Sequence, residues 1–534
     1  MFATARLGSR YILAFVLAVL LLWTWRSYGN RPMLRMGRFK YVASSYDWSK
    51  AKTYHPVTDM KNMPTGQSKQ LPKVQKVASS PTKDPVAEER KEIIKSKFVK
   101  SWNAYKKYAW KADELRPLSK KGAETFSGWG AQLVDALDGL WIMGLKDDFY
   151  AGVQEVAVID WYDTHDQAIN LFEVTIRYLG GLLAAYDLSQ ESVLLRKAVE
   201  LGDTLYATFD TPNRLPSHWL NYGRAKAGTQ TADTLMSIAA GGTLCLEFTR
   251  LSQITGDPKY YDATERLKLM FHRLQNDTDV PGLWTHDINY YKEELINSRF
   301  SLGGGADSMY EYLPKMHQLL SGMDPQYEQM ATTSLQAAKD WLLFKPMTIK
   351  DEDILLPGSG IMSQGVKDFS TEAEHLACFA GGMYALAGKL LANQDFVHTG
   401  ARLTSGCVWL YDVMPGKIMA ENQQLHACES KTGPCEYDPK FFKGYLSEGL
   451  PPGLVACRSK HYSSRPEAIE SVYYMWRITR DQKWRDAAWR MWEGIVAASE
   501  TDEAFATVRD VTRVPIAGGG WEDRMEVSSC SHSL

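Results

Sequence analysis

The sequence predicts an all-α protein in which helical hairpins close into a ring. From residue 89 to residue 498, thirteen segments repeat apolar residues at three- and four-residue steps, the spacing of an amphipathic helix, and no clear strand alternation is seen. Paired helices of this length form either a ring or a solenoid. The sequence has no repeat of fixed period, which counts against a solenoid. Among the predicted helices are Glu89–Leu115, Ala168–Leu188 and Gln394–Val413.

Composition sets the broad class of the protein. The apolar content of 45 % is ordinary for a chain with a buried core. The formal net charge of -2 gives no basic excess of the kind that binds nucleic acid. The 27 Tyr and 17 Trp residues suit a carbohydrate-facing cavity, although most of these rings are expected in the core.

The first 87 residues are predicted to lie outside the folded domain. Tyr11–Trp25 is almost wholly apolar and no small-residue cleavage site follows it, so residues 1–32 are interpreted as a cytosolic tail and an uncleaved signal anchor. More Arg and Lys residues follow this segment than precede it, which alone predicts a cytosolic C-terminal side. We expect the opposite, type II orientation because the rest of the chain has lumenal features. Residues 33–87 lack periodicity and are predicted to be a stem that acts as a plain tether.

Phe172–Tyr186, reading FEVTIRYLGGLLAAY, is the predicted helix with the most evident chemistry. Glu173 and Arg177 are four residues apart and share a face beside an apolar stripe. From spacing alone, an exposed ion pair is the commoner explanation. The Gly180-Gly181 pair lies in the middle of the pattern, where a glycine costs roughly 1 kcal/mol against alanine. That cost indicates close packing or the close approach of a ligand.

Seven cysteines and one glycosylation sequon bear on the compartment. No CxxC pair occurs, so a zinc site is not expected. Cys428 and Cys435 are close enough in sequence to close a short loop. The odd number leaves at least one cysteine free or bridged to another chain. Asn276 begins the sequon, in a polar loop that fits lumenal exposure.

Five stretches resemble the signatures of glycoside hydrolase family 47, the class I α-1,2-mannosidases. In chain order they are GWGAQLVDALDGLWIMGL (128–145), FEVTIRYLGGLLAAY (172–186), SLGGGADSMYEYLPK (301–315), EHLACFAGGMYALA (374–387) and SRPEAIESVYYMWRIT (464–479). All five occur in the family's order. The resemblance spans residues 88–526, which we interpret as the catalytic domain.

This resemblance implies an (α/α)7 barrel that removes α-1,2-linked mannose from high-mannose N-glycans with inversion and needs a calcium ion. Carried over by motif, the catalytic carboxylates are Glu173, Asp307 and Glu467. Glu467 is the expected general base, and the acid is either Glu173 or Asp307. The acid must hold a proton near neutral pH, so burial or a like-charged neighbour should raise its pKa.

Five further residues match sugar-contacting or cavity-lining positions of the family: Arg177, His375, Arg465, Glu470 and Glu526. Simpler explanations exist for some of them. A single His such as His375 is more often a satisfied core residue. Arg465-Pro466-Glu467 also reads as the start of a helix. The resemblance further implies a disulfide between Cys378 and Cys407, and hence an oxidising lumen.

The chain departs from the family at two places. Ala240 stands where many members carry a sugar-contacting glutamate, which would alter the mannose that is preferred. Residues 527–534 no longer match and contain no TEAH-like segment, whose threonine is the family's calcium ligand. No metal ligand is therefore identifiable, and the family's C-terminal helix and hairpin are expected to be absent.

Two functional readings remain open from the sequence. The first is a glycosidase of N-glycan processing, a monomer held in the endoplasmic reticulum or Golgi membrane by its anchor, with a lumenal catalytic domain. The alternative is a catalytically impaired, mannose-binding lectin-like factor in glycoprotein quality control. The missing C-terminal segment favours the second reading, and the intact carboxylates favour the first.

Overall fold

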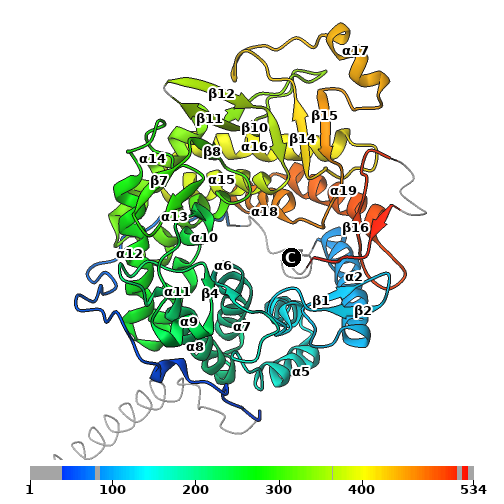
Figure 1. The fold of residues 1–534 in the computed structure, drawn as a ribbon. Helices are drawn as coiled ribbons and strands as arrows, with labels where there is room; N and C mark the ends of the chain where they lie inside the picture. Colours follow the sequence, from blue (N-terminus) through cyan, green and yellow to red (C-terminus); the bar gives the residue numbers. More distant parts are fainter. Residues whose placement is uncertain (1–38, 78–83, 364, 514–519, 527–534) are drawn as a thin grey trace, which may run out of the picture.

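The computed structural model describes residues 39–77, 84–363, 365–513 and 520–526. Helices arranged around a ring dominate these residues (Figure 1). The helices are α2 (Pro85–Tyr108), α3 (Ala131–Asp135), α4 (Leu137–Ile142), α5 (Lys146–Val156), α6 (Leu171–Val174), α7 (Gly180–Ser189), α8 (Ser192–Tyr206), α9 (Tyr222–Ala227), α10 (Ile238–Gly242), α11 (Cys245–Thr255), α12 (Pro258–Leu274), α13 (Asp307–Leu319), α14 (Pro325–Trp341), α15 (Ala380–Leu390), α16 (Gln394–Val413), α17 (Pro439–Ser447), α18 (Glu467–Thr479) and α19 (Gln482–Ser499). A π-helical turn, Thr175–Leu179, joins α6 to α7.

Consecutive helices pack in pairs, which confirms the predicted ring of hairpins. Within the described ranges the pairs are α4 with α5, α7 with α8, α11 with α12, α13 with α14, α15 with α16, and α18 with α19. The predicted anchor at Tyr11–Trp25 and the predicted tail at residues 527–534 lie outside those ranges. In the part of the chain that the structure describes, no helix is both long and apolar enough to span a bilayer.

Several helices begin at an Asp-Pro pair that can be read directly from the sequence. The starts of α2, α12, α14 and α17 share this pattern. In α12, for example, the Asp257 side chain accepts a hydrogen bond from the Lys259 N–H, and Pro258 occupies the first helical position. The Asp satisfies a first-turn donor, and the Pro lacks only an N–H that would have had no partner within the helix.

The helices end at the predicted residues except where a left-handed residue or a π-helical turn interrupts the helix. Gln394–Val413 is helical over the predicted range. The helix predicted over Glu89–Leu115 ends at Tyr108, because the chain turns at Lys111 (φ 72°) and then enters a short strand. The helix predicted over Ala168–Leu188 starts three residues later and includes the π-helical turn.

Short antiparallel strands shape the loops between the helices. They are β1 (Glu114–Arg116), β2 (Lys121–Ala123), β3 (Ile169–Asn170), β4 (Trp219–Leu220), β5 (Met236–Ser237), β6 (Asp287–Asn289), β7 (Glu294–Ile296), β8 (Arg299–Ser301), β9 (Leu343–Phe344), β10 (Leu356–Pro357), β11 (Ser359–Ser363), β12 (Val366–Ser370), β13 (Glu372–Glu374), β14 (Asn422–Leu425), β15 (Leu454–Ser459), β16 (Thr507–Val508) and β17 (Trp521–Glu522). They form the sheets β1-β2, β3-β4, β5-β6-β7, β8-β11-β12, β9-β10, β13-β14-β15 and β16-β17.

Two disulfides tie the last third of the described chain. Cys378 is bonded to Cys407, as the resemblance implied, and Cys428 is bonded to Cys435. The first bridge joins the segment just before α15 to α16. Among the described residues, Cys245 and Cys457 carry free thiols.

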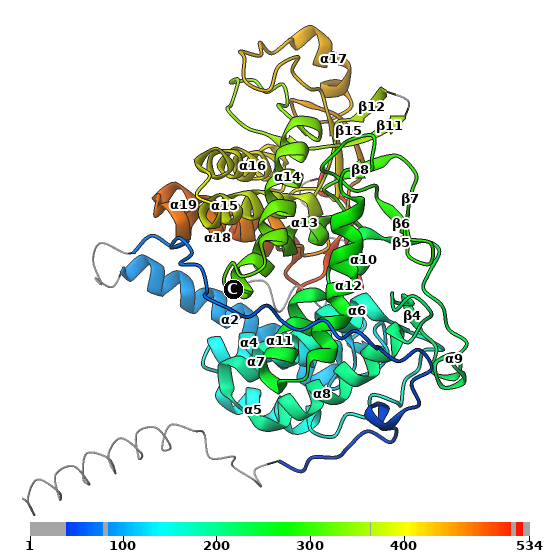
Figure 2. The ribbon, with the colours of Figure 1, turned by 90° about the vertical axis from the view of Figure 1, so that its left-hand side faces the viewer.

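Residues 39–77, called the strap below, follow the outside of the ring (Figure 2). The prediction of a plain tether is therefore wrong for these residues. Glu200 on α8 accepts hydrogen bonds from the Tyr41 hydroxyl and from the Ser44 backbone. Further along, the Lys61 N–H donates to Asp262 on α12 at 2.7 Å, and the Lys76 N–H donates to the Arg477 carbonyl of α18 at 3.0 Å. The strap thus crosses several hairpins in succession.

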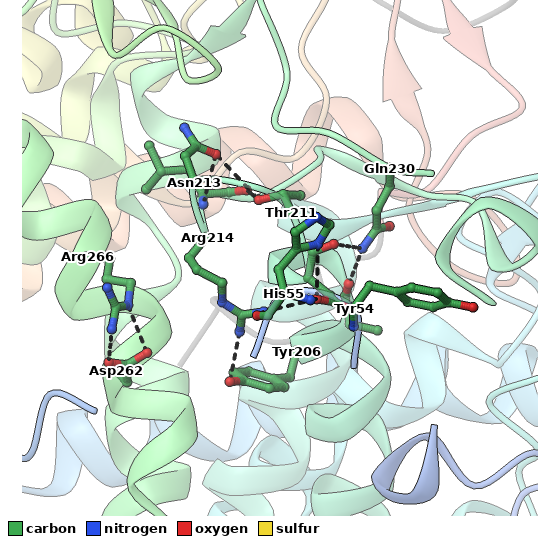
Figure 3. Close-up of polar contacts among 12 residues, drawn as sticks. Tyr54, His55, Tyr206, Thr211, Asn213, Arg214, Gln230, Asp262 and Arg266 are labelled. Atoms are coloured by element: carbon green, nitrogen blue, oxygen red, sulfur yellow. Dashed lines mark hydrogen bonds and ion pairs between the residues drawn. The ribbon is translucent and has the colours of Figure 1, made fainter. Parts of the chain in front are cut away.

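The middle of the strap shows why it is ordered without periodicity. The carboxylate of Asp210 accepts the backbone N–H groups of Tyr54 (2.8 Å) and His55 (2.7 Å). Arg214 lies between the His55 carbonyl and the Tyr206 hydroxyl (Figure 3). Side chains of the ring therefore satisfy backbone groups that a helix or strand would pair internally. Trp48, which is 8 % exposed, adds an apolar anchor.

An apolar groove separates α2 from α18 and α19. It is lined by side chains such as Phe98 on α2, Ile469 on α18 and Ile495 on α19, and Arg465 and Pro466 also line it. In the described residues, α2 is not packed with a neighbouring helix as a hairpin. The groove therefore lies between α2 and the start of α18.

Candidate active site

Glu173 lies at the start of α6 and is paired with Arg177, as the spacing predicted. Asn170 caps the helix, because its side-chain oxygen accepts the Glu173 N–H at 2.9 Å. Arg177 Nε donates to Glu173 Oε2 at 2.8 Å, and its guanidinium is also 3.8 Å from Asp135. The prediction of close packing at the glycine pair is confirmed: a Cβ at Gly181 would lie 3.0 Å from the Val134 carbonyl oxygen.

Asp307 is the first residue of α13 and follows three glycines. The Gly304 N–H donates to Glu374 Oε2 at 2.9 Å, and a Cβ at Gly303 would lie 2.1 Å from the same oxygen. A larger residue at position 303 would therefore displace the Glu374 carboxylate from its hydrogen bond with Gly304. Ser308 donates to Asp307 Oδ1 through its N–H at 2.6 Å. Burial raises the pKa of Asp307 to about 6, although the Ser308 hydrogen bonds oppose this.

Glu467 is the first residue of α18, so the helix-start and catalytic readings of this segment are compatible. Its Oε2 is buried without a hydrogen-bond partner and lies 3.5 Å from His375 Nδ1. On the other side, Arg465 Nη1 is 4.0 Å from Glu467 Oε1, while Arg465 Nε donates to Glu421. Glu467 is thus flanked by two potentially cationic groups, neither of them in a close hydrogen bond with it.

His375 is completely buried and lies beside Glu467. Its Nε2 is 2.8 Å from the Tyr411 hydroxyl, and its backbone N–H donates to the Glu421 carbonyl at 2.8 Å. These contacts fix the ring of His375 beside the carboxylate. Its burial, however, leaves little surface for contact with a sugar, although the sequence placed it among the sugar-contacting or cavity-lining residues.

Glu470 lies one helical turn beyond Glu467 and faces a second buried ionic cluster. Burial and the charge of Glu311 raise the pKa of Glu470 to about 8, so it is largely protonated at neutral pH. Lys315 donates a hydrogen bond to Glu311 at 2.6 Å, so these two residues form an ion pair one helical turn apart on α13. A protonated Glu470 can donate as well as accept a hydrogen bond.

Glu526, the last described residue, links the two sides of the site electrostatically. Its carboxylate lies 2.8 Å from Arg524. Its charge also contributes to raising the pKa of Arg177 and of Arg465. The site residues predicted from motifs therefore gather in one region, where Glu467 also acts on the pKa of Asp307.

Three acidic residues near the site were missed by the sequence reasoning. Asp135 lies within the first family-like stretch, and burial raises its pKa to about 7. Glu421 holds Arg465. Glu247, whose pKa burial also raises to about 7, accepts a hydrogen bond from the Tyr312 hydroxyl at 2.8 Å. A signal existed for Asp135, because it belongs to a quoted motif, whereas Glu421 lies outside all five motifs.

The resemblance implies a calcium ion, and the threonine that holds it in the family has no counterpart identified in this sequence. Over the described ranges no group of three or more His, Cys, Asp and Glu side chains stands close enough to hold a metal ion. Two of the site carboxylates, those of Glu173 and Glu421, are already engaged by arginines. No catalytic step is therefore derived through a metal.

Comparison with known proteins gives matches over most of the chain. A sequence model of glycosyl hydrolase family 47 matches residues 97–534, which runs past Glu526, where the motif comparison placed the end of the resemblance. A mannosyl-oligosaccharide alpha-1,2-mannosidase of Penicillium citrinum is 34% identical over 451 residues, 82% of this chain and 83% of the relative. One from Coccidioides posadasii is 32% identical over 446 residues, 81% and 82% of the two chains. The solved alpha-1,2-mannosidase from Trichoderma reesei superimposes with a TM-score of 0.75 at 30% identity, covering 84% of this chain and 92% of that one.

Proposed function

Because the chain belongs to glycosyl hydrolase family 47, we propose that its ring hydrolyses α-1,2-linked mannose from high-mannose N-glycans with inversion. The observation that carries this proposal is the placement of Asp307 and Glu467 at the starts of two helices of the ring, each partly buried and in electrostatic contact with the other. The relatives named above bear enzyme names, which favours the glycosidase over the lectin-like alternative.

In this proposal Glu467 is the general base. An inverting enzyme needs one carboxylate to take a proton from water and one acid to protonate the leaving oxygen. The Glu467 side chain is 17 % exposed, so part of it can be reached by a water molecule, while its Oε2 atom is buried beside His375. The water oxygen bonds to the anomeric carbon, its proton passes to Glu467, and the bond to the leaving oxygen breaks.

Asp307 is the carboxyl group that we assign to hold the proton for the leaving oxygen. Its pKa of about 6 keeps roughly a tenth of the group protonated at pH 7, far more than for an ordinary aspartate with a pKa of 3.8. Glu173 instead accepts a hydrogen bond from Arg177 at 2.8 Å. The structure therefore supports Asp307 over Glu173 as the proton source. Arg177, Arg465, Glu470 and Glu526 remain the proposed contacts to sugar hydroxyls, and His375 is proposed to position Glu467.

The test is hydrolysis of a high-mannose oligosaccharide, followed by mass spectrometry. The intact chain should release hexose units, and Glu467→Gln should lower turnover by about three orders of magnitude, the middle of the range for general acid–base catalysis. Glycan binding should persist in that variant. Glu448→Gln, at an exposed position after α17, is the matched control and should keep full activity. Full turnover in Glu467→Gln would show that the base is another residue.

The same assay with a chelator tests the calcium requirement that the family implies. Loss of hydrolysis on chelation, restored by added calcium, would support a bound calcium ion.

The two disulfides support an oxidising compartment, and we propose the lumen of the secretory pathway, with the chain anchored in the endoplasmic reticulum or Golgi membrane. Asn276 is exposed and is a proposed glycan acceptor, which removal of N-glycans followed by mass measurement would test.

A further inference from the structure

An exposed tryptophan lies beside the helix that carries Glu173. Trp219 on β4 is 53 % exposed, an unusual position for so large an apolar ring. Its backbone pairs with Asn170 on β3, the residue that caps the Glu173 helix. Side chains directly opposite each other in an antiparallel pair are about 5 Å apart at their Cβ atoms. Trp219 is therefore close to the start of α6, as Figure 1 also shows for β4 and α6.

The contacts of His218 strengthen this placement. The Leu171 N–H donates to the His218 carbonyl at 2.8 Å, and His218 Nε2 is 3.0 Å from the Asn170 amide nitrogen. The Trp219 ring packs edge-on against the His218 ring at 5.5 Å. Among the three proposed catalytic carboxylates, Glu173 also has an open side chain, 31 % exposed against 17 % for Glu467. Trp219 thus lies beside the segment that carries Glu173, whose side chain is open to solvent.

Two more exposed apolar side chains lie on segments that Asp233 connects to the Trp219 strand. Leu235 is 64 % exposed and Tyr291 is 50 % exposed. Asp233 joins the three segments: its carboxylate accepts the His218 N–H at 2.6 Å, and its carbonyl accepts the Tyr291 N–H at 3.0 Å. Figure 2 shows β4, β5 and β6 along one side of the molecule. We call Trp219, Leu235 and Tyr291 the rim cluster.

We propose that the rim cluster, centred on Trp219, binds mannose residues of the glycan that are not cleaved. This inference rests on the proposed function, because it places the rest of the same substrate beside the site. A pyranose ring has an apolar C–H face that packs on an aromatic ring, while its hydroxyls need polar groups nearby. Binding sites for small ligands combine apolar and aromatic surface with a few polar groups. The backbone of Trp219 is held by the Ser217 hydroxyl at 3.0 Å, so the platform is preformed.

The test compares a short and a long substrate. Trp219→Ala should raise KM about tenfold for a branched high-mannose oligosaccharide, which corresponds to about 1.4 kcal/mol, with kcat nearly unchanged. For α-1,2-linked mannobiose, which is too short to reach both the site and the rim, both constants should stay within about twofold of the wild type. Trp219→Phe should recover most of the oligosaccharide affinity, because it retains an aromatic face. Trp341→Ala, at an exposed tryptophan on α14, is the matched control.

The outcomes separate this proposal from the proposed function. Equal changes with both substrates, or no change with either, would overturn the rim cluster as a binding platform. A loss seen only with intact glycoprotein would mean that the cluster contacts polypeptide, which also overturns it. If the wild type hydrolyses neither substrate, the proposed function fails. Calorimetric titration with the uncut oligosaccharide then still decides the platform, which requires weaker binding by Trp219→Ala than by the wild type.

Discussion

The two sides of the site are held in different ways. On the Glu173 side, the partner of the carboxylate is Arg177, one turn along the same helical segment, and the hydrogen bond between them is direct. On the Glu467 side, the flanking groups are His375 and Arg465, and Arg465 is itself held by Glu421, the residue just before β14. One side is local in sequence, and the other is assembled from segments far apart.

This difference predicts how each catalytic carboxylate responds when a residue that holds it is replaced. A local pair survives as long as its helix does, because helix geometry keeps positions four apart together. On the Glu467 side, the position of Arg465 depends on two carboxylates that both attract it, those of Glu467 and Glu421. Arg465 lies 4.0 Å from Glu467 while it donates a close hydrogen bond to Glu421, so Glu421 keeps the cation from pairing fully with the base. Disturbing the assembled side should therefore harm catalysis more than disturbing the local side.

Among the partner residues of the two carboxylates, the largest effect is expected from Glu421→Gln. The neutral amide holds Arg465 less strongly, so the guanidinium shifts toward Glu467 and pairs with it more closely. A carboxylate paired with a cation is a poorer acceptor for a proton from water, and kcat should fall about 100-fold, as for a small displacement of a positioned group. Steady-state kinetics measures this, with the exposed Glu429→Gln as control. An unchanged kcat would mean that Arg465 keeps its place without Glu421.

A smaller effect is expected from Arg177→Met on the local side. Glu173 loses its hydrogen bond. Asp135 loses its nearest cation, so its pKa, which burial already raises to about 7, should rise further. We expect kcat/KM to fall about tenfold, because the proposed proton donor and base are untouched. If Arg177→Met lowered activity as much as Glu421→Gln, the two sides of the site would be equally sensitive, and the proposed difference between them would be wrong.

The pH dependence sharpens the assignment of the acid. Asp307 is protonated below its pKa of about 6, so activity that needs the proton should decline as pH rises through that value. Its ordinary pKa is 3.8, so the native state binds more protons between 3.8 and about 6, and this group makes stability fall as pH rises across that window. A pH profile of kcat/KM with no alkaline limb near 6 would exclude Asp307 as the acid.

The smallest effect on activity is expected from removing the Cys378–Cys407 bond with paired serines. The bond closes a loop with a sequence separation of 29, so its loss should lower the free energy of unfolding by about 3–4 kcal/mol. The bond lies behind His375, so kcat should change by less than about threefold while the domain stays folded. Thermal unfolding and kinetics on the same sample separate the two effects. A large fall in kcat would show that the bridge also fixes His375.

Contacts between residues close in sequence could be predicted, whereas contacts between distant segments could not. The ring of hairpins, the Glu173–Arg177 pair and the carboxylates at helix starts follow from periodicity, spacing and motif. Glu421 could not be predicted, because its partner Arg465 is 44 residues away and no local pattern joins them. The strap was missed for a related reason. Its backbone is satisfied by side chains such as Asp210 on the ring, and such pairing leaves no periodicity in the strap itself.

The strap also determines how the ring responds to tension. A pull on the chain ahead of residue 39 would first load the contacts at Glu200, then those at Asp210, and only later those at Arg477. Each contact would have to detach before the next one carried the force. The helices that hold the carboxylates would therefore be mechanically insulated from whatever the N-terminal end is attached to.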